Sequence, residues 1–421
     1  MPRPTAVPAH GSGAAVASGC ERPDDKAYDA VLDRVFARVL AQETRLAEEQ
    51  ARGRELFAEL MAYLPTRQTL LVANSVRFRD RTVCECLLAE SHEEGFNDPG
   101  RALELARLAV SVASALSAES CGGGEMLHSL QARAWAQLGN ALRIRADYTE
   151  AECAFAVADS LLAEDPRINA LDVARVLDLK ASLRRRQLQY VEACRLLDRV
   201  IAIYRKLGQW NLLGRAFYQK AVVYADAGNT DSQVKLLRSA LDLLDPNEDP
   251  RLFVGIRHSL ILALTESGRA REAFALLFHT RPQYLKLGDR RSLVNLRWLE
   301  GTVAMGMQRT EQAEAAFREV RDASVELGQD YDAALAALDL ASVYALQGRA
   351  GELRQLAAES LAIFQSRQIH REAMAALLVF HSAAEMEQAE LALVHEVATF
   401  LKRARNNPSL QFRTSQEPRL S

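Results

Sequence analysis

The sequence predicts an all-α protein, folded as a right-handed α-α superhelical solenoid of about eight helical hairpins. Three observations support this fold class. The 421-residue chain is dominated by alanine, leucine, arginine and glutamate, which favour helices. A pattern of small and large apolar residues recurs about every 40 residues, and glycines recur at the same step. Together these features predict one helix-turn-helix unit in each period.

The repeat is clearest between residues 135 and 158. It reads Trp135-Ala-Gln-Leu138-Gly139-Asn-Ala-Leu142, followed by Ala151, Phe155 and Ala158. The last three positions recur as Ala193, Leu197 and Val200; Gln233, Leu237 and Ala240; Ala273, Leu277 and Thr280; Ala313, Phe317 and Val320; Leu353, Ala357 and Ser360. Antiparallel helices approach closely only where small residues meet, and one hairpin cannot bury its apolar face alone. The pattern therefore predicts hairpins stacked on a continuous core.

This pattern resembles the tetratricopeptide repeat, W-x2-L-G-x2-Y followed by A-x3-F-x2-A, with Leu142 where tyrosine is usual. The unit is about 40 residues long rather than the common 34, so longer helices are expected. Armadillo and HEAT repeats have that length and remain the structural alternative. The longer units also resemble the sensor domains of maltose-activator-like bacterial regulators and of Rap-type peptide receptors. The resemblance implies a surface that binds a protein or a peptide.

Helix caps and turns are expected in step with the repeat. Three glycines that each follow a leucine are expected as left-handed C-caps: Gly208, Gly288 and Gly328. Three others are expected in the turns: Gly228, Gly268 and Gly348. Asp165-Pro166 and Asp249-Pro250 each predict an N-cap followed by proline in the first helical position. Pro282 falls late in a second helix, which it is expected to kink or to end early.

The chain divides into five predicted regions. They are a disordered tail at 1–26, a helical capping segment at 27–68, a divergent first hairpin with a glycine-rich break at 69–126, the regular solenoid at 127–405, and a second disordered tail at 406–421. Apolar residues follow helical spacing in the capping segment, which either covers the first hairpin or pairs with a second copy of the chain. A homodimer through residues 27–64 is therefore one expectation.

No motif in the sequence indicates catalysis, a cofactor or a metal. The chain has no GxxxxGK[ST], GxGxxG, HExxH or GxSxG sequence. His381 and Glu385 share a helix face, but no third metal ligand lies nearby. A net charge of -3 argues against nucleic-acid binding, and no apolar stretch is long enough to span a membrane. Six cysteines without a CxxC pair favour a reducing cytoplasm.

The resemblance places the binding surface on the concave side, which the first helix of each hairpin lines. Carried onto this sequence, the groove residues are Arg133, Asn140, Arg143, Arg175, Asp178, Arg185, Arg215, Tyr218, His258, Asn295 and Trp298. Arginine and asparagine suit carboxylates or the backbone of an extended peptide, and tyrosine and tryptophan are common interface anchors. The expected ligand is a protein or peptide segment, acidic toward residues 133–215 and apolar beyond. In the alternative interpretation, the arginines are solvated and Trp298 belongs to the core.

Two functions remain open at this point. The first is a non-catalytic scaffold that binds a protein or peptide in its groove. The second is a sensor that responds to a ligand or peptide and controls a separate effector. The second lacks a recognisable effector module, because residues 1–68 are short and weakly patterned.

Overall fold

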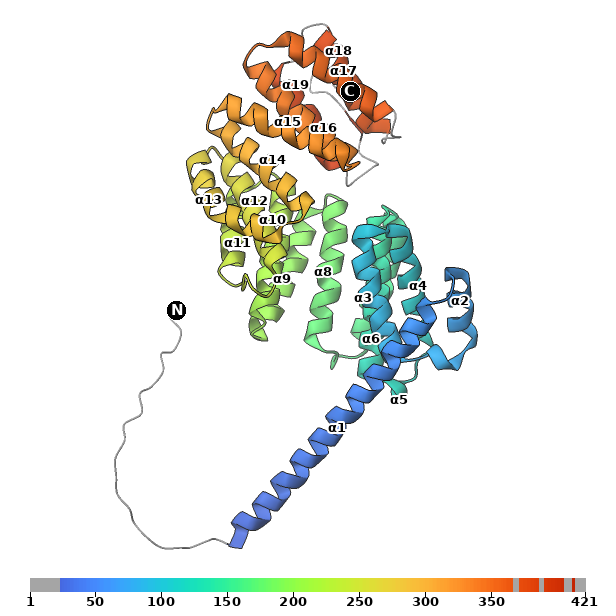
Figure 1. Ribbon diagram of the computed structural model, residues 1–421. Helices are drawn as coiled ribbons and strands as arrows, with labels where there is room; N and C mark the ends of the chain where they lie inside the picture. The colour runs from blue at the N-terminus through green and yellow to red at the C-terminus, as the bar shows by residue number, and fades with distance from the viewer. Residues whose placement is uncertain (1–22, 366–370, 386–389, 405–410, 413–421) are drawn as a thin grey trace, which may run out of the picture.

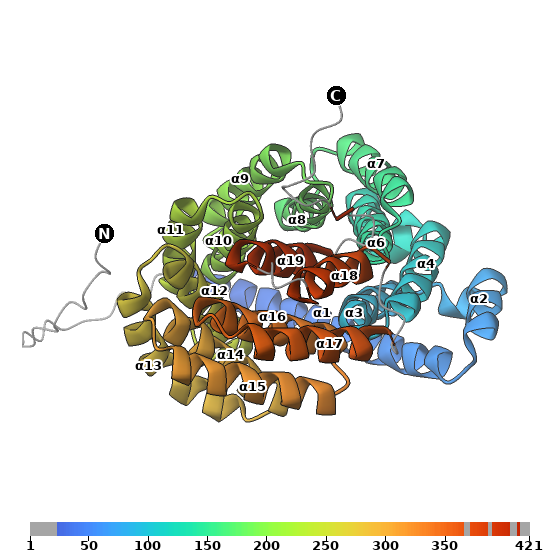
Figure 2. The same ribbon diagram turned by 90° about the horizontal axis from the view of Figure 1, so that it is seen from above.

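The computed structural model describes residues 23–365, 371–385, 390–404 and 411–412. Over this part of the chain every regular element is helical, with nineteen α-helices and one short 3-10 helix, η1. Sixteen of the α-helices form eight antiparallel hairpins (Figure 1). Viewed from above, the hairpins wind counterclockwise toward the viewer, which makes the superhelix right-handed (Figure 2). The predicted fold class is confirmed.

The hairpins follow one another along the chain. They are α3 (Arg81–Asn97) with α4 (Pro99–Ala115), α6 (Gly124–Ile144) with α7 (Tyr148–Glu164), α8 (Ala170–Arg186) with α9 (Tyr190–Lys206), α10 (Trp210–Asp226) with α11 (Thr230–Leu241), α12 (Pro250–Glu266) with α13 (Ala270–Leu287), α14 (Arg290–Gly306) with α15 (Thr310–Glu326), α16 (Asp330–Leu346) with α17 (Ala350–Gln365), and α18 (Arg371–Glu385) with α19 (Leu391–Ala404). No helix among the described residues is long and apolar enough to cross a membrane.

A long helix precedes the hairpins. This helix, α1 (Pro23–Met61), is followed by α2 (Pro65–Asn74) and η1 (Val76–Phe78), and α5 (Ala118–Cys121) lies between the first two hairpins. The helix starts inside the stretch expected as a tail, because residues 23–26 already belong to it. The remainder of that tail lies outside the described residues, as does the tail expected at 406–421 apart from residues 411–412.

Close contacts between helices explain the small residues of the repeat. A Cβ atom added to Gly139 would lie 2.7 Å from the ring of Phe155, and one added to Gly301 would lie 2.8 Å from the ring of Phe317. Both phenylalanines are buried. A larger residue at either glycine would push the two helices of the hairpin apart, so the small-large pattern sets their spacing.

Each turn inside a regular hairpin holds one residue with a left-handed backbone. These residues are Ala146 (φ 65°), Leu188 (φ 63°), Gly228 (φ 75°), Gly268 (φ 74°), Gln308 (φ 60°) and Gly348 (φ 68°). The expected C-cap glycines, Gly208, Gly288 and Gly328, also have positive φ. Glycine adopts this conformation without steric cost, whereas the other three residues are strained in it.

Two of the expected helix boundaries need correction. Asp249 caps α12 by accepting a hydrogen bond from the Leu252 amide at 3.0 Å, as predicted. Asp165 does not cap a helix start, because its carboxylate accepts from the amide and guanidinium of Arg167; α8 begins later, behind Asn169. Pro282 does not end its helix early, because α13 continues to Leu287, and the kink expected as the alternative stays a prediction.

Candidate functional site

The first helices of the hairpins line the concave side of the superhelix, and the last hairpin lies inside its outline when seen from above (Figure 2). Two neighbouring cavities open on this side, of about 610 Å³ and about 470 Å³. The larger one is formed mainly by α3, α6, α8 and α10, and the smaller one by α12, α14, α16 and α19. Tyr218 lines both, so the two cavities are neighbours in the groove.

The larger cavity, called here the charged cavity, contains many ionisable side chains. Its lining includes five of the predicted groove residues, Arg133, Arg175, Asp178, Arg215 and Tyr218, together with Glu85 and Glu93 of α3. The charged cavity therefore matches the arginine-rich end expected from the sequence.

These arginines already have acidic partners inside the chain. Arg175 donates to Asp172 at 2.9 Å, and Arg133 lies 3.6 Å from the same carboxylate. Asp172 is buried and also accepts a hydrogen bond from Ser129 at 2.6 Å. Arg215 pairs with Asp249 at 3.0 Å. Asp172 was not among the residues predicted from the sequence, although its position three residues before Arg175 suits an ion pair on one helix face.

Asp178 is a polar residue of the charged cavity with one buried, unpaired oxygen. Its Oδ1 atom is buried and has no hydrogen-bond partner among the described residues. Burial raises the pKa of this carboxyl to about 6, and the positive charges of Arg215 and Arg143 oppose that rise. A buried acceptor without a donor costs free energy, so this oxygen lowers the stability of the fold around the charged cavity.

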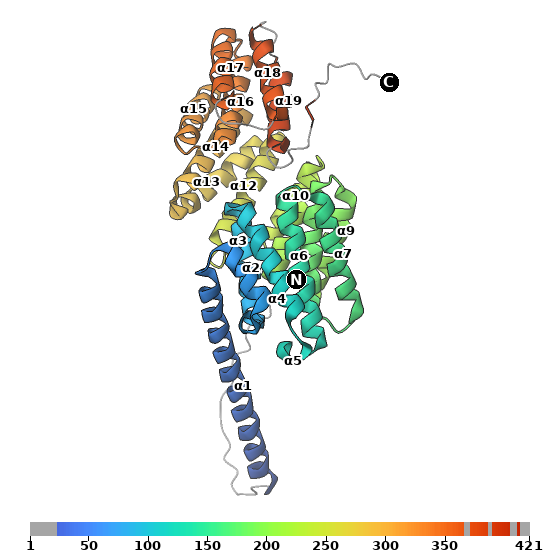
Figure 3. The ribbon, with the colours of Figure 1, turned by 90° about the vertical axis from the view of Figure 1, so that its right-hand side faces the viewer.

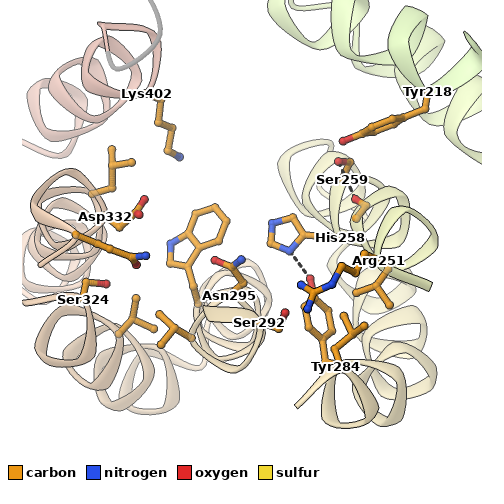
Figure 4. Close-up of a pocket in the computed structure, with 18 residues that line it drawn as sticks. Tyr218, Arg251, His258, Ser259, Tyr284, Ser292, Asn295, Ser324, Asp332 and Lys402 are labelled. Atoms are coloured by element: carbon orange, nitrogen blue, oxygen red, sulfur yellow. Dashed lines mark hydrogen bonds between the residues drawn. The ribbon is translucent and has the colours of Figure 1, made fainter. Parts of the chain in front are cut away.

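The smaller cavity, called here the aromatic cavity, is built around His258 and Trp298. Their rings stack at a centroid distance of 5.7 Å and an interplanar angle of 21°. The Nδ1 atom of His258 is hydrogen-bonded to the hydroxyl of Tyr284 at 2.7 Å. Burial lowers the pKa of His258 to about 4, so the imidazole is neutral near pH 7. Figure 4 shows Asn295 and His258 facing the same space, with Tyr218 and Lys402 on opposite sides of it.

Two further features of the aromatic cavity were not predicted. Lys402 of α19 places its Nζ atom 5.6 Å from the centre of the Trp298 ring, a cation-π contact across the groove. The Ser324 hydroxyl is buried and has no hydrogen-bond partner among the described residues. The indole N–H of Trp298 donates to Asp339 at 2.6 Å, and burial raises the pKa of that carboxyl. Trp298 is thus both part of the core and part of the cavity wall.

The other three predicted groove residues line neither of these cavities. Arg143 donates two hydrogen bonds to the buried Asn140, at 2.7 and 3.1 Å. Burial and, to a smaller extent, the nearby charge of Arg186 lower the pKa of Arg143 to about 10. Arg185 pairs with Asp226 at 3.0 Å. Arg143 and Asn140 thus bond within α6, whereas Arg185 connects α8 to α10.

No protein-family model matches the sequence, and no curated protein matches it. Solved structures share the fold. Aspartyl phosphate phosphatase F from Bacillus subtilis has a TM-score of 0.53 at 13% identity, over 85% of this chain and 97% of that one. A Rap protein complexed with competence and sporulation factor has a TM-score of 0.52 at 12% identity, over 77% and 88%. The apo form of RapI has 0.50 at 14%, over 67% and 97%. The expected likeness to Rap-type tetratricopeptide solenoids is confirmed at the level of the fold.

Proposed function

We propose that this chain is a non-catalytic receptor that binds an extended protein or peptide segment along the charged and aromatic cavities. The observation that carries this proposal is the pair of neighbouring cavities with Tyr218 in both walls, one lined by Arg133, Arg175 and Arg215 and the other by the His258–Trp298 stack. An extended backbone supplies N–H and C=O groups at regular intervals, and so it fits two neighbouring cavities. The Rap protein bound to competence and sporulation factor supports this use of the fold.

The two cavities suit different parts of the ligand. In the aromatic cavity, the Trp298 and His258 rings offer a flat wall for an apolar side chain, and the Asn295 amide can donate and accept backbone hydrogen bonds. In the charged cavity, a ligand carboxylate would compete with Asp172 for Arg133 and Arg175. We therefore place an acidic ligand group nearer Lys402, which has no carboxylate within ion-pair distance among the described residues.

A sensor that controls a separate effector is the second candidate. The observation that favours it is the position of Lys402, which brings the last hairpin into the wall of a cavity formed by α12, α14 and α16. A ligand bound there contacts hairpins that are distant in the chain. It can therefore change how the C-terminal hairpin sits on the array.

Peptide capture tests the proposed function. The full chain is immobilised and exposed to a library of random hexapeptides, and retained peptides are identified by mass spectrometry. We expect the wild type to enrich a defined set, and the double variant Asp178→Ala/Asn295→Ala to lose it. The matched control is Lys235→Ala, an exposed residue on α11, which should retain the set. The proposal is contradicted if the wild type enriches no peptides, or if the double variant enriches the same set as the wild type.

A further inference from the structure

Much of α1 projects away from the solenoid (Figures 1 and 3). Every side chain from Leu32 to Arg52 is exposed, and this segment is called here the α1 arm. At 1.5 Å per residue the arm is about 30 Å long. Contact with the body begins at Gly53, where an added Cβ would lie 2.3 Å from the Cβ of Thr82 on α3.

The arm exposes an apolar stripe. Its members are Leu32 (36% exposed), Val35 (52%), Phe36 (63%), Val39 (46%), Leu40 (61%) and Leu46 (45%). Single exposed apolar residues are normal, whereas a row of them on one helix face marks an interaction surface. In proteins, a helix gains most of its stability by packing its apolar face against other elements. Within the described chain, the apolar face of the arm is exposed instead.

Four of the six stripe residues follow the spacing of a two-stranded coiled coil, and Phe36 and Leu40 take the neighbouring e and b positions. Leu32, Val39 and Leu46 lie seven residues apart, and Val35 lies between the first two, three residues after Leu32. These are the a and d positions of a heptad, with Gln42 in the next d position. One polar residue in such a seam fixes the register at some cost in stability.

The charges beside the seam identify the partner and its direction. Arg38 and Arg45 occupy successive g positions, and Glu43 and Gln50 occupy the e positions five residues after each. In a parallel pair of identical helices, each g residue faces the following e residue of the other helix. Arg38 then meets Glu43 of the second copy, and Arg45 meets Gln50. In an antiparallel pair the g positions face each other, which would place arginine against arginine.

The seam ends where α1 begins to pack on the solenoid. Glu49 takes the next d position and is paired with Arg45 of its own helix at 3.3 Å, and Gly53 takes the next a position while packing on Thr82. Neither residue adds apolar surface to the seam. The coiled coil is therefore confined to the arm, and a parallel arrangement holds both solenoids at the same end of it.

We propose that the α1 arm forms a parallel coiled coil with the α1 arm of a second copy of this chain. The protein is then a dimer that presents two grooves side by side. Two grooves bind a ligand with two matching segments more tightly than one does, because the second contact is intramolecular.

Sedimentation equilibrium of the full chain tests the dimer. The wild type should have the mass of two chains. Val35→Glu/Val39→Glu should raise the dimer dissociation constant at least about a hundredfold, because four carboxylates would be buried in one seam. Ala41→Glu/Thr44→Glu adds the same charge to the opposite face of the arm and should stay dimeric. Thermal unfolding of the solenoid should be the same in both variants, since the arm does not pack on it.

Charge reversal tests the direction. Arg38→Glu alone and Glu43→Arg alone should each weaken the dimer, by about tenfold, because each creates two like-charged pairs. The combined variant should regain the wild-type dissociation constant. A monomeric wild type, or a dimer that survives Val35→Glu/Val39→Glu, overturns the coiled coil. Failure of the combined variant to recover overturns the parallel direction.

Discussion

The charged and aromatic cavities lie side by side in one groove but are built in different ways. The charged cavity is formed mainly by the first helices of consecutive hairpins, and its arginines pair with carboxylates nearby in the array, such as Asp172 and Asp249. The aromatic cavity needs Lys402 of the last hairpin to complete its wall. The first is therefore fixed by neighbouring first helices, whereas the second also depends on how the last hairpin packs on α16.

The largest effect is expected in the aromatic cavity. Trp298→Ala removes the stack on His258 and leaves the buried Asp339 carboxylate without its indole donor. The free energy of unfolding should fall by about 4 kcal/mol, which urea denaturation can measure. Trp298→Phe keeps an aromatic ring but removes the N–H group, and should cost about half as much. Equal losses in the two variants would show that the hydrogen bond to Asp339 carries the effect and the stack contributes little.

In the charged cavity the corresponding change is Asp172→Ala. It removes the acceptor of the Ser129 and Arg175 hydrogen bonds and the ion-pair partner of Arg133, and leaves two arginines side by side. We expect a loss of about 2 kcal/mol in stability, smaller than for Trp298→Ala because Arg175 is half-exposed. The loss should shrink with added salt, which screens the repulsion between the arginines. Asp172→Asn is the control that keeps the shape and one acceptor oxygen. A loss independent of salt in both variants would contradict this account.

The different construction of the two cavities also explains what the sequence could predict. The hairpin register and the turn glycines were predictable because each depends on residues close together in one repeat, such as Gly139 and Phe155. Nothing in the local pattern places Lys402 opposite Trp298, since that contact depends on how α19, two hairpins further on, packs on α16. Asp172 was not predicted for another reason. The family resemblance predicts only the positions that face the groove, and the Asp172 carboxylate lies beside those positions. Arg143 lies at a groove position but bonds Asn140 instead.

The pH dependence of stability should report on the charged cavity through its residue Asp178. Burial raises the pKa of Asp178 to about 6 in the folded protein, above the value of about 3.9 in an unfolded chain. Between these values the native state binds more protons than the unfolded state, so stability falls as pH rises from about 4 to about 6. Asp178→Asn should remove this loss, which is on the order of 2 kcal/mol at pH 7. Urea midpoints across this pH range provide the measurement. If wild type and variant keep a constant difference at every pH, Asp178 has no raised pKa.

The smallest effects on stability are expected in two turns, each inside a hairpin whose first helix lines one of the cavities. Leu188 joins α8 to α9 and Gln308 joins α14 to α15, and both hold a left-handed backbone with exposed side chains. Replacing either by glycine should stabilise the protein by about 0.5–1 kcal/mol, because the strain relieved exceeds the added freedom of the unfolded chain. Gly228→Ala, the reverse change in the hairpin between them, should cost about 1 kcal/mol. Thermal denaturation of the three variants measures these differences. If glycine stabilises the protein at position 188 but not at position 308, the two turns differ in strain. If glycine destabilises the protein at both positions, the added freedom of the unfolded chain outweighs the strain relieved in the turn.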